Sequence, residues 1–439
     1  MIWSLIMKNP LTIKFAAIFF ITLLLLIPIT LISNLIEERE WRHQEVKNDI
    51  ANSSSRAQKI MGPLLLVRYW HIEKSDDKET KKLKTKFFLP HEITIDSDMK
   101  TFEKKRGIYS ALLYRSLTQI SGSIDTTLLT PYLNKHLDSV NLVVAVSDMR
   151  GIGVDTQARI NNKLIEIKPG TLLSGLSEGI HISLTPTQLK EHTSIQFDLS
   201  MPLLGMESLD FVPIGNKSQI SLIADWPHPS FKGKYLPLQS NIDASSFSAQ
   251  WQTSYFTTNI AQLMSQCIYR AKCDELKSRS LGVNLIDPVD HYLKSHRSIN
   301  YAFLMIVLAF ACFFILEIIR KQPIHPIQYG FVGLALALFY LLLLSLSEHL
   351  GFNMAYGISA SASTVLLTYY VASILNNKIH TIVFATALSS LYALMFILLG
   401  AEDYALLLGS LLIFSVLSLI MSMTKNLDWY SNQTTAIND

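Results

Sequence analysis

The sequence predicts an α+β membrane protein: a six-helix transmembrane bundle with a large, mainly antiparallel, sandwich-like β domain inserted between helices 1 and 2. Hydrophobic residues make up 49% of the 439 residues, and the mean hydropathy of +0.27 is too high for an ordinary soluble protein. The long apolar runs lie before residue 36 or after residue 298. Between these positions, apolar and polar residues alternate with a period of two, which is typical of half-buried strands.

The first apolar run, residues 15–35, carries no charge and would form a helix about 30 Å long, the thickness of a bilayer core. It has neither the short apolar region nor the small-residue cleavage site of a secretory signal, so we expect a retained anchor. Pro28 should kink this helix or be accommodated by packing. Five further runs are long enough to cross a bilayer, namely 299–319, 327–347, 353–375, 379–399 and 405–423.

The basic residues between the apolar runs predict the orientation of the chain in the membrane. They all fall on one side of the implied zigzag, which we assign to the cytoplasm: Lys8, Lys14, Arg320, Lys321, Lys378 and Lys425. The opposite turns carry Glu348 with His349, and Glu402 with Asp403. Both termini are therefore expected in the cytoplasm and the long insert outside the cytoplasmic membrane.

The predicted domain organisation follows from these boundaries. It comprises a cytoplasmic N-terminus with the first helix (1–35), an external β-rich domain with helical stalks (36–298), five transmembrane helices (299–424) and a cytoplasmic tail (425–439).

The insert is long enough to bury its own core. Strands are expected where the alternation occurs, at 84–89, 140–147, 163–167, 180–184, 195–201, 220–226 and 247–255. The two ends of the insert lack this alternation and predict helical stalks. Asp287, Pro288 and Asp290 resemble the first turn of a helix, so the second membrane helix is expected to begin near Pro288 and to run on without a break.

The segment DWPHPSFKGKYLP at 225–237 places His228 between two prolines. Pro227 removes a ladder donor, so the strand at 220–226 should end with Trp226. A rigid corner pinned by Trp226 and Phe231 accounts for these residues without chemistry, because aromatic burial stabilises by about 1.5–3 kcal/mol per side chain. The alternative is a binding or catalytic role for His228, and we favour the corner.

A second motif, DMRGIGV at 148–154, contains a Gly-x-Gly but lacks the third glycine and the following helix of a nucleotide-binding loop. A tight turn or bulge in which Arg150 pairs with Asp148 is the favoured interpretation. The sequence has no HExxH, GxSxG, Walker or CxxC motif, and His181, His192 and His228 lack the spacing of metal ligands. We therefore expect no enzyme activity, cofactor, metal or nucleic-acid partner.

Cys267 and Cys273 fall outside the membrane in this topology, where oxidation is favoured. We therefore expect a disulfide between them rather than two free thiols. It would argue against one helix through both positions, because residues six apart point to different faces.

Ionisable residues in the apolar runs lie near the predicted helix ends rather than at mid-depth, which disfavours a transporter. They are Glu317, Glu348, His349, Glu402 and Asp403.

The chain resembles the CreD family of inner-membrane proteins. The matching segments include LLLLIPITLISNLIEER, SRAQKIMGPLLLV, KRGIYSALLY, VSDMRGIGV, DWPHPSFKGKYLP, WQTSYFTTN, HPIQYGFVGLALALFYLLLLSLSEHLGF, ALLLGS and NLDWY. The resemblance implies an inner-membrane protein of Gram-negative bacteria. Together with the predicted topology, this location puts the insert in the periplasm. The resemblance also implies an association with the CreB and CreC two-component response and with envelope integrity under stress. The family's molecular activity is not established, so the resemblance transfers no catalytic residues.

The leading hypothesis is a non-enzymatic envelope protein that sits in the lipid bilayer. Its periplasmic β domain would bind an envelope protein, peptidoglycan or lipid. One alternative is a transporter or channel gated by this domain, with Glu348 or His349 on the path. A cell-wall hydrolase using His228 and Asp225 ranks third.

Overall fold

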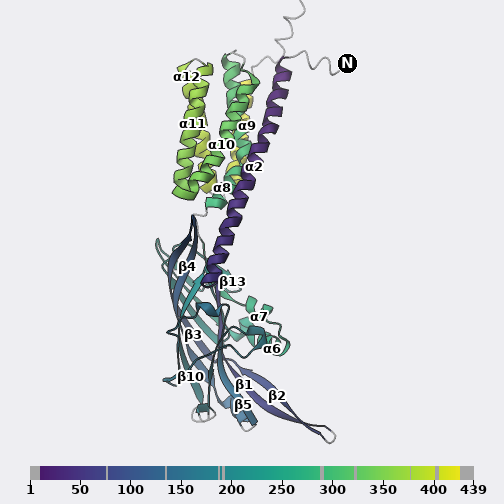
Figure 1. Ribbon diagram of the computed structural model, residues 1–439, viewed down its shortest axis with the longest axis vertical. Helices are drawn as coiled ribbons and strands as arrows, with labels where there is room; N and C mark the ends of the chain where they lie inside the picture. The colour runs from purple at the N-terminus through teal and green to yellow at the C-terminus, as the bar shows by residue number, and fades with distance from the viewer. Residues whose placement is uncertain are drawn as a thin grey trace, which may run out of the picture. The chain divides into compact units, whose positions relative to one another are not determined.

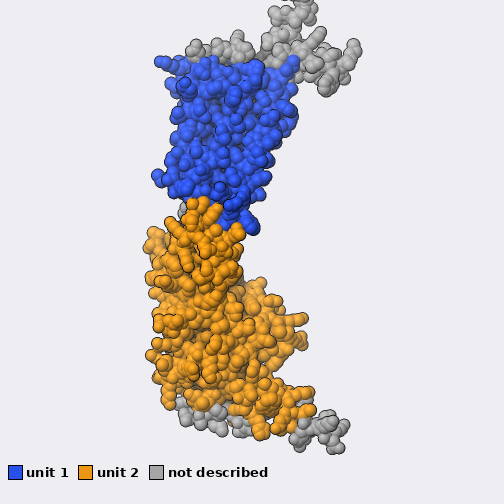
Figure 2. All heavy atoms as spheres, viewed as in Figure 1, with its two compact units in different colours: residues 1–44, 289–439 blue, residues 45–288 orange. Residues whose placement is uncertain are grey.

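The computed structural model describes residues 10–75, 78–133, 136–185, 188–189, 193–286, 291–320, 324–375, 377–400 and 405–425. The chain forms two compact units, which Figure 2 colours separately. The helical unit comprises Met1–Gln44 and Val289–Asp439, and the β unit comprises Glu45–Pro288.

The helical unit contains a helix at each of the predicted apolar runs (Figure 1). They are α2 (Pro10–Ser53), α8 (His291–Asn300), α9 (Ala302–Arg320), α10 (Pro326–Leu350), α11 (Phe352–Leu375), α12 (Lys378–Gly400) and α13 (Ala405–Thr424). Helix α2 passes through Pro28 and continues to Ser53, so the first predicted stalk is helical. Helix α10 begins with Pro326 in its first turn, where the missing N–H of proline leaves no bond unmade.

Among the described residues, four helices are long and apolar enough to cross a membrane: α2, α10, α11 and α12. The number rises to five if α8 and α9 form one bent span. The count of six spans therefore stays a prediction.

The second membrane helix is not continuous, contrary to our expectation. Helices α8 and α9 meet at Tyr301 and are bent by 47°. The Tyr301 N–H donates to the Ser298 carbonyl 3.1 Å away, three residues back, and such a tightened turn redirects a helix. The predicted helix start at Asp287, Pro288 and Asp290 lies outside the described residues, as do Lys8, His192, Lys321, Glu402 and Asp403.

The described part of the β unit contains two eight-stranded sheets (Figure 1). The first sheet has the order β13-β16-β11-β1-β5-β9-β8, with β2 also paired to β1. Its strands are β1 (Gln58–Ser75), β2 (Lys78–Phe88), β5 (His136–Val146), β8 (Lys168–Pro169), β9 (Gly179–Ser183), β11 (Ser208–Val212), β13 (Pro229–Gly233) and β16 (Leu281–Leu285).

The second sheet has the order β14-β15-β12-β3-β4-β10-β6-β7. Its strands are β3 (Glu92–Arg106), β4 (Tyr109–Asp125), β6 (Gln157–Ile160), β7 (Lys163–Ile165), β10 (Ser194–Met206), β12 (Lys217–Ala224), β14 (Gln239–Ile242) and β15 (Phe247–Ser254). Most neighbouring strands are antiparallel, while β1 with β11 and β3 with β12 are parallel.

Both sheets contribute to one hydrophobic core. Leu65 of the first sheet belongs to the same buried cluster as Ile95, Leu199 and Trp251 of the second. Strand β10 shows how the sequence pattern produces this core. Its residues alternate between exposed and buried along Ser194–Leu199, because successive side chains of a strand point to opposite faces. The period-two pattern therefore defines the inward face of this strand.

The opposite face of the first sheet is partly covered by two helices, α6 (Ile260–Arg270) and α7 (Asp274–Ser278). Met61 and Val212 of the sheet pack with Met264 and Leu276 of these helices in a second buried cluster. Where α7 ends, this face of the sheet becomes accessible and forms the cavity described next.

Candidate functional site

Asp148 and Arg150 form a compact turn that ties several elements of the β unit together. The Arg150 guanidinium donates to both carboxylate oxygens of Asp148, at 2.9 and 2.7 Å. Asp148 also accepts from the Arg56 backbone N–H at 3.0 Å, and Gln58 Nε2 donates to its carbonyl at 2.8 Å. A Cβ at Gly151 would lie 2.2 Å from Gln58 Nε2, so only glycine fits this turn.

The DWPHPSFKG segment carries the chain from one sheet to the other. Strand β12 ends at Ala224, two residues before the predicted end at Trp226, because Asp225 turns aside to accept from Thr101 N and Oγ1 at 2.7 and 2.9 Å. Strand β13 of the other sheet then begins at Pro229.

Aromatic side chains hold this crossing in place. Trp226 Nε1 donates to the Ile286 carbonyl at 2.9 Å. The Phe231 ring lies edge-on to Phe247 and Trp251, with centroids 6.0 and 5.9 Å away. His228 is exposed and its ring lies against Trp226. Since Asp225 is engaged by Thr101, the structure does not assemble an acid–base pair from Asp225 and His228.

Glu348 and His349 lie at the end of α10 in the helical unit. The Tyr292 hydroxyl donates to Glu348 Oε1 at 3.2 Å, and Arg39 Nε lies 3.9 Å from the same oxygen. His349 is exposed. Glu348 therefore links three helices rather than lining a described cavity.

The buried carboxylate of Glu317, on α9, forms a similar link in the helical unit. It is ion-paired with Lys14 of α2, and it accepts from the Tyr329 hydroxyl of α10 at 2.8 Å. The Ile324 N–H also donates to it, at 3.2 Å. Among the described residues, the contacts of this carboxylate join α2, α9 and the start of α10, which is a structural role.

Cys267 and Cys273 are joined by a disulfide in the structure. Helix α6 stops at Arg270, and Ala271 takes a left-handed conformation with φ 53°, so no helix runs through both cysteines. A Cβ at Gly175 would lie 2.5 Å from Cys273 Sγ. The disulfide thus packs directly behind a loop that forms one wall of the cavity.

The site that the sequence did not reveal is a row of paired residues across four strands of the first sheet. Lys59 of β1 is paired with Asp210 of β11, Asp210 with Gly282 of β16, and Gly282 with Lys232 of β13. Directly paired residues project from the same face of a sheet. Because Gly282 has no side chain, Lys232 can reach across it towards Asp210.

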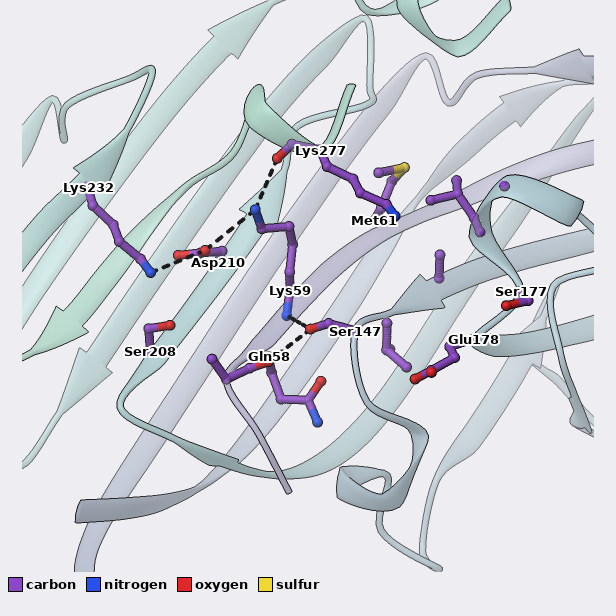
Figure 3. A pocket seen from close by; sticks show the side chains of 15 residues that line it. Gln58, Lys59, Met61, Ser147, Ser177, Glu178, Ser208, Asp210, Lys232 and Lys277 are labelled. Atoms are coloured by element: carbon purple, nitrogen blue, oxygen red, sulfur yellow. Dashed lines mark hydrogen bonds and ion pairs between the residues drawn. The ribbon is translucent and has the colours of Figure 1, made fainter. Parts of the chain in front are cut away.

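The two lysines converge on one oxygen of the Asp210 carboxylate, as Figure 3 shows. Lys232 Nζ lies 3.4 Å and Lys59 Nζ 3.8 Å from Asp210 Oδ2. Lys59 Nζ also donates to the carbonyl of Lys277, at the end of α7, at 3.0 Å. Asp210 is only 7% exposed, and its other oxygen, Oδ1, is buried without a hydrogen-bond partner among the described residues.

This row lines a cavity of about 490 Å³ in the β unit (Figure 3). Apolar groups of Met61, Ala145 and Leu176 share its wall with the charged row, and Ser177 and Glu178 lie in the lining loop. Its volume lies in the range of about 300–1,000 Å³ that is typical of small-ligand sites.

The electrostatics of the cavity are dominated by lysine. Burial raises the pKa of Asp210, although the ammonium groups of Lys232 and Lys59 act in the opposite direction. At Asp148, burial also acts to raise the pKa, but the hydrogen bonds from Arg150 and the Arg56 N–H outweigh it and hold the pKa below its usual range. Of these two carboxylates, Asp210 lines the cavity and has a buried oxygen without a hydrogen-bond partner among the described residues.

Metal binding finds no support in the described part of the chain, which contains no group of three or more His, Cys, Asp or Glu side chains that could hold an ion.

Apolar helices of membrane-crossing length, joined to a β unit with its own core and cavity, define a membrane-anchored β protein. The family model described as "Inner membrane protein CreD" matches residues 10–430. The inner membrane protein CreD of Escherichia coli strain K12 is 34% identical over 431 residues, covering 97% of this chain and 95% of the relative. The chain belongs to the CreD family of inner-membrane proteins, and the family resemblance seen in the sequence is confirmed.

Proposed function

We propose that this inner-membrane protein supports cell envelope integrity by binding a ligand or partner through its β unit on the periplasmic side. The carrying observation is the cavity formed by Lys59, Asp210, Lys232 and the end of α7. As the family resemblance implies, we place this role within the response of the CreB and CreC two-component system.

The geometry favours binding over catalysis. The proposed enzyme pair, Asp225 and His228, is not assembled, and the cavity carboxylate Asp210 is engaged by two lysines. A row of charged residues beside apolar side chains can hold a ligand in a fixed orientation, whereas nucleophilic catalysis needs a nucleophile within reach of a base.

Site-specific photo-cross-linking in living cells tests this proposal. A photoreactive amino acid replaces Ser177, an exposed residue in the cavity wall, in the full-length chain. The matched control carries it at Gln250, an exposed position on β15 of the other sheet. We expect a reproducible adduct from position 177 that is absent from position 250.

Failure to recover any adduct at position 177 under envelope stress would contradict the proposal. A Lys232→Gln variant provides an independent readout, because it should impair rescue of an envelope-stress phenotype in a deletion strain. Lys217→Gln, which alters an exposed lysine paired with Glu92 outside the cavity, should rescue fully.

A further inference from the structure

We propose that the cavity binds an organic oxyanion, a ligand carrying a phosphate or carboxylate group on an apolar body. This inference rests on the proposed function, because it names the chemical class of the ligand for the same site.

The positive groups in the cavity exceed what the internal ion pairs require. Three lysines line it, Lys59, Lys232 and Lys277, against two carboxylates, Asp210 and Glu178. Asp210 offers Lys59 and Lys232 a single shared oxygen. Each ammonium has three donors. Lys232 has one described contact and Lys59 has two, Asp210 and the Lys277 carbonyl. Donors therefore remain on both lysines for an acceptor from outside the protein.

The position of these donors is fixed by the sheet rather than by flexible loops. Lys59, Asp210 and Lys232 lie on three strands in direct register, with Gly282 between the last two. A Cβ at Gly282 would lie 2.2 Å from the Leu209 carbonyl and 2.7 Å from Asp210 Oδ1, so a side chain there would block the approach of Lys232. Glycine at this position is a requirement of the charged row.

The buried carboxylate of Asp210 also affects how tightly the two lysines can bind a ligand. Its negative charge holds the two ammonium groups near each other, although like charges repel. Its Oδ2 is shared at 3.4 and 3.8 Å, longer than a good charge-assisted hydrogen bond of about 2.7–2.9 Å. An oxyanion that bridges the lysines can therefore form closer contacts than Asp210 does.

The apolar part of the wall specifies the rest of the ligand. Met61, Leu176 and Val146 line the same cavity as the lysines. Figure 3 shows the Lys277 side chain extending towards Met61, so a cation borders the apolar surface. A free inorganic anion would leave this surface without contact, which is why we infer an organic ligand.

Lysine-reactivity mapping on the full-length protein in lipid nanodiscs tests the inference. The sample is acylated with an amine-specific reagent in chloride, inorganic phosphate, inorganic pyrophosphate or acetate at equal ionic strength. Mass spectrometry then gives the modification rate of each lysine. An anion present at twice its Kd should slow modification of Lys59, Lys232 and Lys277 about threefold. Exposed Lys217, on the other sheet, is the internal control.

Slowing by phosphate or pyrophosphate alone identifies a phosphate ligand, and slowing by acetate alone identifies a carboxylate ligand. Equal rates in all four salts, or equal slowing of Lys217, would overturn the inference.

Two variants separate binding from structural ion pairing. Lys277→Gln changes an exposed side chain and should weaken the anion's protection of Lys59 and Lys232 by several-fold. Asp210→Asn removes the competing negative charge and should strengthen that protection. If both variants leave protection unchanged, the lysines serve only the internal pair and the inference is wrong.

The outcome also distinguishes this inference from the proposed function. A partner cross-linked at position 177 with no anion protection would leave the binding role standing and remove only the oxyanion. If neither an adduct at position 177 nor anion protection of the lysines is found, both proposals are wrong.

Discussion

Asp148 and Asp210 are both buried carboxylates of the β unit, yet their surroundings shift the pKa in opposite directions. Asp148 accepts two hydrogen bonds from the Arg150 guanidinium and further bonds from backbone N–H groups. Asp210 meets two more distant lysines, and its Oδ1 lacks a described partner. One buried carboxylate thus has its hydrogen bonds made and the other does not, and this difference leads to two predictions.

Asp148→Ala should lower the free energy of unfolding by about 2 kcal/mol, the usual range for charged hydrogen bonds to a buried carboxylate. The folded-state pKa of Asp148 lies below the ordinary value of 3.8 for an aspartate. Its contribution is therefore present above that value and is lost as the pH falls through the folded pKa. Thermal unfolding of the full chain by circular dichroism measures both effects. Asp98→Ala, at an exposed position, is the control and should change little; an equal loss in both variants would contradict the role of the turn.

Asp210 should show the opposite pH dependence. Its pKa is raised above 3.8 in the folded protein, so the folded state binds more protons than the unfolded one and stability falls as the pH rises through this window. Asp210→Asn removes that fall, so the melting temperature of the variant relative to the native chain should increase from pH 3.8 towards neutrality. A difference that stays constant or declines over the same range would show that burial does not dominate at Asp210.

At the scale of elements, the disulfide supports one wall of the cavity from behind. It packs against Gly175 of the lining loop, and Lys277 of α7 lines the cavity itself. Cys267 and Cys273 are six residues apart and fix the turn between α6 and α7. Replacing both with serine should cost roughly 2 kcal/mol, the chain-entropy value for so short a loop. Hydrogen exchange should rise in α6 and α7 while β3 and β4 are unchanged. Cys312→Ser is the control, and exchange unaffected by the double substitution would contradict this role.

In the helical unit, Glu317 connects α2, α9 and the start of α10. Glu317→Gln leaves Lys14 buried without its counter-charge and should destabilise the unit by about 3 kcal/mol. Replacing both residues with methionine removes both charges and should recover most of that loss. The alkylation rate of Cys312, a free thiol on α9, reports opening of the bundle. Equal rates for the single and double variants would mean that the pair is not coupled.

The elements themselves were largely predictable from the sequence, and the site was not. Strands such as β10 and β15 alternate so regularly that a single face is defined by local pattern. Lys59, Asp210, Gly282 and Lys232 each look ordinary in their own strands. Only the register of β1, β11, β16 and β13 brings them together, and two of those pairings join segments more than 50 residues apart.

In both predicted motifs, the residue that lines the cavity is a neighbour of the residue that the sequence analysis singled out. DWPHPSFKG drew attention to His228, but the residue of this segment that reaches the cavity is Lys232, four positions later. A basic residue just after a proline corner was the available signal. Similarly, DMRGIGV directed attention to Asp148, while the preceding Ser147 lines the cavity and accepts from the Lys59 N–H at 2.6 Å.

At the scale of the whole molecule, the proposals require that the β unit face the periplasm. We expect this orientation from the positions of Lys14, Arg320, Lys378 and Lys425 in the sequence, since basic residues are retained on the cytoplasmic side. The apolar helices and family membership establish a membrane protein, and the side on which the β unit lies is a separate physical question.

Labelling with a membrane-impermeant maleimide in intact spheroplasts answers that question most directly. In a Cys312→Ser background, one variant carries Ser240→Cys on exposed β14 and another carries Lys378→Cys at the start of α12. We predict that the thiol at position 240 is labelled before lysis and the thiol at position 378 only after lysis. Labelling of position 240 only after lysis would place the β unit in the cytoplasm and contradict the proposed role in the envelope.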